Sequence, residues 1–79
     1  MEETKIYTQD EFTDAYALQT ILEVAAILKA RGYQPINQIV GYLMSGDPGY
    51  ITSYQNARTK IQQFERTKLL EVLVKEILS

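Results

Sequence analysis

The chain has 79 residues, 46% of them hydrophobic, and a formal net charge of −2. A chain of this length holds one domain and buries only about 60–65% of the surface that its unfolded form exposes. It contains neither cysteine nor histidine, which excludes disulfides and leaves zinc without a good ligand set. No signal peptide and no apolar run near the ~20 residues of a membrane span is visible, so we expect a cytoplasmic protein without membrane insertion.

The charges are distributed unevenly along the chain. Residues 1–14 carry five acids against one lysine, whereas residues 15–66 carry five bases against three acids. Residues 1–13 show no helical stripe, and polar termini of this kind are mobile unless they dock on the body. We therefore predict a flexible acidic N-terminal arm over residues 1–13 and a single helical domain over residues 14–79, with Asp14 as the N-cap of the first helix.

The first two predicted helices are separated by a glycine and a proline. Helix one runs from Asp14 to residue 30 or 31 and is apolar around most of its girth. Gly32 suits the left-handed conformation that ends a helix, and Pro35 suits the first turn of the next one, which runs to about residue 44. The apolar stripes of the two helices are Leu18, Ile21, Leu22, Ala25 and Leu28 in helix one, and Ile36, Ile39, Val40 and Leu43 in helix two.

The rest of the chain is predicted to contain a turn and two further helices. Gly46 and the sequence Asp-Pro-Gly at 47–49 predict a helix stop and a turn. Thr52 and Gln55 have the spacing of a capping box at the start of helix three, and Thr67 is expected to cap helix four. The fold class is therefore all-α, a compact bundle of four main helices with a short turn between helices two and three.

Self-association is expected from the same patterns. Helices one and four are more apolar than surface helices of a small domain need to be, and no disulfide or metal is available to stabilise the fold. Gly41 lies mid-helix, where glycine costs about 1 kcal/mol relative to alanine, and close approach of another backbone is the expected reason. We predict a homodimer with helices one and four and the region around Gly41 at its interface.

The central stretch of the chain, which contains all of its glycines and prolines, resembles a known protein family. Residues 32–51 read GYQPINQIVGYLMSGDPGYI, and the similarity continues through NAR at 56–58 and FER at 64–66. This run resembles the signature of the IreB family, also known as UPF0297. The resemblance implies a small, helical, dimeric regulatory protein of Gram-positive bacteria with no known catalysis. It also implies phosphorylation near the N-terminus by a membrane Ser/Thr kinase of the PASTA type, a phosphatase, an unidentified downstream protein partner and a role in cell-envelope stress.

Threonines of the N-terminal arm are the candidate phosphorylation sites. In the family, the modified threonine follows an acid and precedes an aromatic residue by a few positions. The sequence Glu-Thr-Lys-Ile-Tyr at residues 3–7 matches that arrangement best, which makes Thr4 the first candidate and Thr8 the second. A phosphate adds a charge of about −1.5 to −2. Our hypothesis is that this charge changes how the arm docks on Arg58, Lys60 or Arg66, or how it is presented to a partner.

Catalysis and cofactor binding are not expected. Without histidine or cysteine, acid–base chemistry would depend on scattered carboxylates or tyrosines, and no nucleophile–base arrangement is visible. The glycines of residues 45–51 lack the Gly-Lys-Ser/Thr ending and the preceding strand of a phosphate-binding loop. We instead predict a protein-interaction patch, because tyrosine is enriched at binding hot spots. Its candidate residues are Tyr33, Asn37, Tyr42, Tyr50, Arg58 and Arg66.

The alternative function is that of a small helical nucleic-acid-binding module. A helix, a turn and a helix are present, and Arg58, Lys60, Arg66 and Lys68 would be positioned to contact phosphates. Against this, the isoelectric point is about 5.0, and residues 45–53 are longer than the 3–4-residue turn of a DNA-binding helix-turn-helix. The basic footprint of nucleic-acid-binding proteins is also absent, so nucleic acid is not the expected partner.

Overall fold

The structure is a computed structural model that describes residues 8–79. Within this part of the chain there are no strands, and the all-α prediction with four main helices is confirmed. Two short 3₁₀ turns lie between the second and third helices. The elements are α1 (Gln9–Ala30), α2 (Pro35–Ser45), η1 (Pro48–Tyr50), η2 (Tyr54–Asn56), α3 (Ala57–Ile61) and α4 (Arg66–Leu78).

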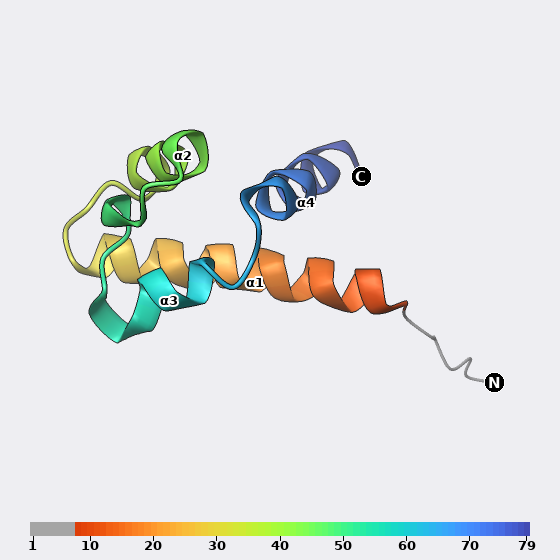
Figure 1. The fold of residues 1–79 in the computed structure, drawn as a ribbon, viewed down its shortest axis with the longest axis horizontal. Coiled ribbons are helices and arrows are strands. Elements are labelled where there is room, and N and C mark those ends of the chain that lie inside the picture. Colours follow the sequence, from red (N-terminus) through yellow and green to blue (C-terminus); the bar gives the residue numbers. More distant parts are fainter. Residues whose placement is uncertain (1–7) are drawn as a thin grey trace.

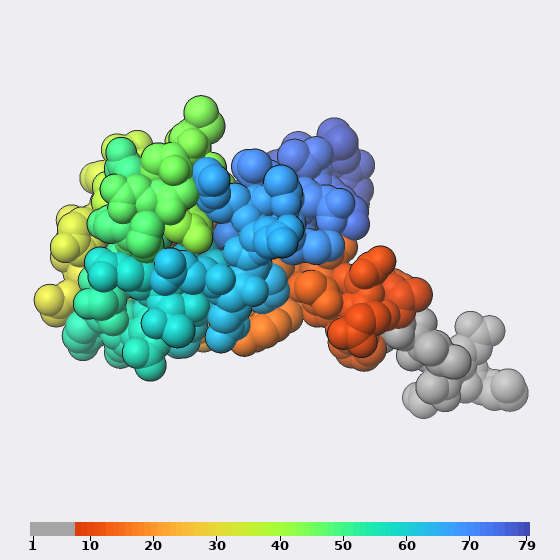
Figure 2. Space-filling view, viewed as in Figure 1, coloured from red at the N-terminus to blue at the C-terminus, as the bar shows by residue number. Residues whose placement is uncertain are grey.

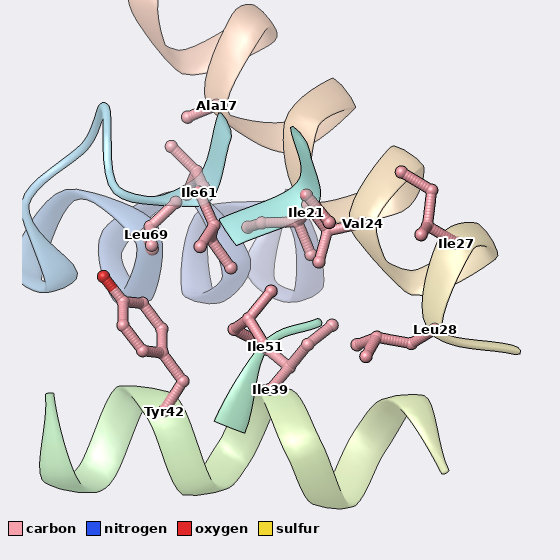
Figure 3. Packing of buried hydrophobic residues seen from close by; sticks show 12 residues of the cluster. Ala17, Ile21, Val24, Ile27, Leu28, Ile39, Tyr42, Ile51, Ile61 and Leu69 are labelled. Atoms are coloured by element: carbon pink, nitrogen blue, oxygen red, sulfur yellow. The ribbon is translucent and has the colours of Figure 1, made fainter. Parts of the chain in front are cut away.

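Helix α1 is the axis on which the other helices pack. Helices α2 and α4 lie over one side of α1, and α3 lies along a different side (Figure 1). The core forms where these elements meet (Figure 3). It consists of Ala17, Ile21, Val24, Ile27, Leu28, Ile39, Tyr42, Ile51, Ala57, Ile61, Leu69 and Val72.

Helix α1 begins earlier than the sequence analysis predicts. Thr8 is its N-cap, and the Thr8 Oγ1 accepts a hydrogen bond of 3.1 Å from the Glu11 backbone N–H. The Glu11 carboxylate accepts the Thr8 backbone N–H in return, which completes a capping box. The prediction that Asp14 caps this helix is wrong. Residues 9–13 are helical, and the part of the predicted arm that precedes Thr8 lies outside the described residues.

The start of α3 also differs from the prediction. The Thr52 hydroxyl accepts a hydrogen bond from the Tyr54 backbone N–H and forms no capping box with Gln55. Gln55 and Asn56 have positive φ angles of 51° and 63°, so the chain kinks there and α3 begins only at Ala57. Two consecutive left-handed residues cannot belong to a continuous right-handed helix.

Helix α4 is not capped by the expected residue. Its N-cap is Glu65, not Thr67, and the helix begins at Arg66. The Glu65 side chain forms no capping hydrogen bond. The first turn of α4 therefore has backbone donors that no side chain satisfies.

Glycine is required at position 41 because an aromatic ring occupies the space that a side chain would need. A Cβ atom at this position would clash with the ring of Tyr50, which packs directly on the helix backbone. The prediction of a close approach is correct, but the approaching group is a side chain of the same chain and not another backbone. The contact fixes η1 against α2, and the Gln38 side chain adds a 3.0 Å hydrogen bond to the Tyr50 carbonyl.

Helix α2 turns a different face inward than its sequence pattern predicts. Ile39 and Tyr42 are buried, whereas Ile36 is 78% exposed and Val40 is 50% exposed. In α1, Leu22 was expected on the buried face and is 64% exposed. Much of the predicted apolar stripe of α2 therefore remains on the surface of the single chain.

Candidate interaction site

An apolar groove runs between α2 and α4, with α1 as its floor. We call it the apolar groove. Its volume is about 330 Å³, and all of its lining residues are apolar. These are Ile21 and Ala25 from α1, Pro35, Ile36, Ile39, Val40 and Leu43 from α2, and Leu73 from α4.

Helices α2 and α4 carry further exposed apolar side chains besides those that line the apolar groove. Figure 2 shows α2 (green) and α4 (blue) side by side, with α3 (cyan) in front of the middle of α1. Met44 on α2 is 80% exposed and Ile77 on α4 is 81% exposed, and Leu70 and Val74 add to the exposed apolar surface of α4. An apolar groove between helices that expose further apolar side chains is typical of a protein interaction site.

A second concavity lies where the C-terminal end of α2 meets the N-terminal end of α4. We call it the end pocket. It has a volume of about 550 Å³ and a mixed polar and apolar lining. Its lining residues are Tyr42, Leu43, Phe64, Glu65, Arg66, Thr67 and Leu70.

Arg66 is held in place at the end pocket. Its Nη1 donates a 3.1 Å hydrogen bond to the carbonyl of Leu43, one of the carbonyls that the end of α2 leaves free. The guanidinium also lies across Gly46, where a Cβ atom would come within 2.8 Å of the Arg66 Cζ. Gly46 has a φ of 75° as the C-cap of α2, so glycine serves both the helix stop and the approach of Arg66.

The six residues of the predicted interaction patch differ in their exposure and in their contacts. Tyr42 is only 5% exposed and shares the end pocket with Arg66. Tyr33 and Asn37 are exposed at the start of α2. Tyr50 packs over Gly41, and Arg58 is half-buried with its Nε donating a 2.9 Å hydrogen bond to the Ile51 carbonyl.

The cations considered for nucleic-acid binding are engaged within the chain. Arg58 and Arg66 bond backbone carbonyls. Lys60 forms a 3.0 Å ion pair with Glu23, and Lys68 forms 2.8 Å ion pairs with both Asp14 and Glu71. These contacts reduce the positive potential available to a phosphate backbone, which weakens the nucleic-acid alternative.

An ionic cluster joins the first half of α1 to α4. Asp14 accepts hydrogen bonds from Lys68 at 2.8 Å and from Lys75 at 2.9 Å. The hydrogen bond from Lys68 is the main cause that lowers the pKa of Asp14, and the same bond raises the pKa of Lys68. Glu71 and Lys75 form a further ion pair of 3.7 Å within α4, and the two bonds to Asp14 tie α4 to α1.

The two candidate phosphorylation sites, Thr4 and Thr8, and the nearby Thr13 lie in different settings. Thr8 is the N-cap of α1, and its oxygen is engaged by the Glu11 N–H. Thr13 lies within α1 and donates a 3.0 Å hydrogen bond to the Gln9 carbonyl. Thr4 lies outside the described residues. A threonine inside a helix or its cap must leave that structure before its hydroxyl can enter a kinase active site.

Comparison with known proteins decides the family. The family model for IreB regulatory phosphoproteins matches residues 2–79. The chain belongs to the IreB family. A UPF0297 protein of Ruminiclostridium cellulolyticum is 44% identical over 75 residues, which cover 95% of this chain and 85% of that relative. The family resemblance seen in residues 32–51 is thus confirmed, and membership assigns the chain to a family of regulatory phosphoproteins.

The first turn of α1 has a local sequence signal, whereas the end pocket has none. The capping box of α1 has the pattern Thr-x-x-Glu at residues 8–11. The end pocket had no such signal, because it depends on how α2 and α4 are placed by α1. None of the helices in residues 8–79 combines the length and the apolarity that crossing a lipid bilayer requires.

Proposed function

We propose that this chain is a non-enzymatic cytoplasmic regulator that acts through protein–protein contacts and is controlled by phosphorylation of its N-terminal segment. The observation that carries the proposal is membership of the IreB regulatory phosphoprotein family over residues 2–79. The kinase in this proposal is a PASTA-type Ser/Thr kinase, opposed by a phosphatase. The output is a change in the response to cell-envelope stress through a downstream protein.

Thr4 is the phosphorylation site that we propose. It lies between an acid and an aromatic residue in the sequence Glu-Thr-Lys-Ile-Tyr. Thr8 and Thr13 are less suited, because their oxygens take part in hydrogen bonds of the first turns of α1. Modification of Thr8 would require the capping box with Glu11 to open.

The second part of the proposal is a homodimer that buries the apolar groove. Ile36 and Val40 line the groove with half or more of their surface exposed, and Met44 on α2 and Ile77 on α4 are 80% and 81% exposed. A surface helix of a monomer normally turns such residues inward. A second copy of the chain would supply matching apolar surface and would bury these side chains, at roughly 25 cal/mol per Å² of apolar area.

The phosphorylation is tested by mass spectrometry. The chain is purified from its own cells before and after cell-wall stress, and the N-terminal peptide is fragmented to place any phosphate. We expect a phosphate on Thr4 and its loss in a Thr4→Ala variant, whereas a Thr13→Ala variant keeps it. A Thr4→Ala protein that the kinase still phosphorylates to full stoichiometry would exclude Thr4 as the main site.

A further inference from the structure

Tyr42 lines the end pocket, and its hydroxyl has no hydrogen-bond partner within residues 8–79. Tyr42 is 5% exposed, and its side chain forms no hydrogen bond to any of residues 8–79. In that part of the chain no fully buried side-chain oxygen or nitrogen lacks a partner, so the Tyr42 hydroxyl must keep access to solvent. Figure 3 shows the ring reaching from α2 toward Leu69 on α4, with the hydroxyl at its tip. A buried tyrosine normally hydrogen-bonds its hydroxyl, so this group is a free donor at the pocket.

The N-terminus of α4 supplies further donors at the same pocket. The first backbone bonds of α4 are those of Lys68 and Leu69 to the Glu65 carbonyl. The Glu65 side chain caps no N–H group, so the Arg66 and Thr67 amides are left for solvent or a ligand. Helix α4 has 13 residues, and the N-terminal end of a helix dipole attracts an anion. Thr67 itself lines the pocket, so its hydroxyl is one more donor there.

Arg66 adds a fixed positive charge. One of its guanidinium N–H groups is used by the Leu43 carbonyl, and the group is seated on Gly46. A guanidinium has five N–H donors, so others stay available to an oxyanion. Because its position is set by contacts within the chain, little side-chain entropy is lost when a ligand binds.

We propose that the end pocket binds a phosphate group. The ligand oxygens would accept from the Tyr42 hydroxyl, the Arg66 guanidinium, the Thr67 hydroxyl and the first amides of α4. The cavity of about 550 Å³ accommodates a phosphate monoester together with part of the residue that carries it. Glu65 also lines the pocket, and its carboxylate opposes an anion, but this residue is exposed and its side chain can turn toward water.

Two sources would present this phosphate group: a free phosphate monoester or a phosphothreonine of a protein segment. The pocket does not rest on the proposed function, because inorganic phosphate tests it without any kinase. A phosphorylated N-terminal segment would connect the two, since binding of phosphothreonine here would give the proposed modification a docking site. Failure at Thr4 and failure at the pocket are therefore separate results.

The test is an NMR titration of the ¹⁵N-labelled full chain at constant ionic strength. One titration uses inorganic phosphate against chloride, and the other uses a peptide of residues 1–8 phosphorylated on Thr4 against the same peptide without phosphate. Saturable shifts of the Arg66 and Thr67 amides with either phosphate ligand support the proposal, and the tighter ligand identifies the source. No saturable shift at these amides up to about 20 mM of either ligand would overturn it.

Point variants separate the pocket from general charge effects. We expect Tyr42→Phe to weaken binding about threefold to tenfold and Arg66→Gln about tenfold, because each removes a donor to a charged oxygen. Glu65→Gln should strengthen binding about threefold, since it removes a nearby negative charge. The controls are Tyr33→Phe and Arg31→Gln, which make the same chemical changes away from the pocket and should leave affinity unchanged. Equal affinity in Tyr42→Phe, Arg66→Gln and the wild type would contradict the assignment.

Discussion

At the residue scale, Gly41 gives a direct test of packing. Alanine in the middle of a helix normally gains about 1 kcal/mol over glycine. In α2 the new methyl group would meet the ring of Tyr50, so we expect Gly41→Ala to destabilise the fold by about 1–3 kcal/mol. Urea unfolding followed by circular dichroism measures the change.

The same measurement on two further variants shows whether the ring is responsible. In a Tyr50→Ala background the clash is gone, and Gly41→Ala should become neutral or stabilising. Met44→Ala, on the same helix and 80% exposed, should change stability by less than about 0.5 kcal/mol. A Gly41→Ala protein as stable as the wild type would show that the Tyr50 contact is not rigid.

The ionic cluster at Asp14 predicts a pH dependence. Because Lys68 and Lys75 lower the pKa of Asp14 in the folded chain, the folded state binds that proton more weakly than the unfolded state. The cluster therefore stabilises the fold above the ordinary Asp pKa of 3.8, and this stabilisation is lost as the pH falls through the lowered folded-state value. Lys68 and Lys75 have raised pKa values, so their contribution is lost only at alkaline pH.

Thermal unfolding as a function of pH checks this prediction. We expect Asp14→Asn to lower the melting temperature at neutral pH and to give a flatter profile toward acid, with the two proteins converging at low pH. Asp10→Asn is the matched control, because Asp10 lies on the same helix but forms no ion pair with α4. Parallel profiles for Asp14→Asn and the wild type would show that the cluster contributes no pH-dependent stability.

At the element scale, the first turns of α1 depend on the Thr8 capping box. Thr8→Ala removes the acceptor of the Glu11 N–H, which typically costs about 1 kcal/mol of helix stability. From Asp14 onward α1 is held by the ion pairs of Asp14 and by the edge-on packing of Tyr16 against Phe64, so we expect fraying to extend no further than Asp14. Amide hydrogen exchange of residues 9–13 should speed up in Thr8→Ala and return to normal in Thr8→Ser.

The ends of the helices show which parts of the fold could be predicted from the sequence. The helix stops at Gly32 and Gly46 followed from backbone chemistry that glycine alone satisfies easily, and both have the expected positive φ. The start of α3 did not follow from the sequence, because Gln55 adopts a left-handed conformation that is unusual for glutamine, although Asn56 belongs to a residue type enriched in that conformation. Arg58 helps to hold this turn by bonding the Ile51 carbonyl, which is a tertiary contact that no local pattern reveals.

At the scale of the whole molecule, the pattern of apolar residues predicted the number of helices but not their orientation. Helix α2 has apolar residues on two faces, and periodicity cannot decide which face meets α1. Burial of Tyr42 and Ile39 turns Ile36 and Val40 outward. The end pocket has the same origin, since it exists only because α1 places the end of α2 beside the start of α4.

The proposed homodimer is tested by placing a charge in the apolar groove. Val40 is 50% exposed and lines the groove, whereas Asn37 is exposed on the same helix outside it. Burying an unpaired lysine at an interface is strongly unfavourable, so Val40→Lys should dissociate the dimer while Asn37→Lys should not. Light scattering at about 50 µM distinguishes the 9.1 kDa monomer from a particle of twice that mass.

The masses from light scattering report on the interface only if each variant is folded. Val40 contributes little to the core of the single chain, so Val40→Lys should keep the helical circular dichroism spectrum of the wild type. A dimeric wild type with a folded, monomeric Val40→Lys protein would identify the groove as the interface. A wild-type chain that is monomeric at this concentration would refute the dimer, and a dimeric Val40→Lys protein would move the interface away from the groove. Because the end pocket and the groove share Leu43, a dimer at the groove would also place the two phosphate sites beside the subunit boundary, where a bound phosphate could change association.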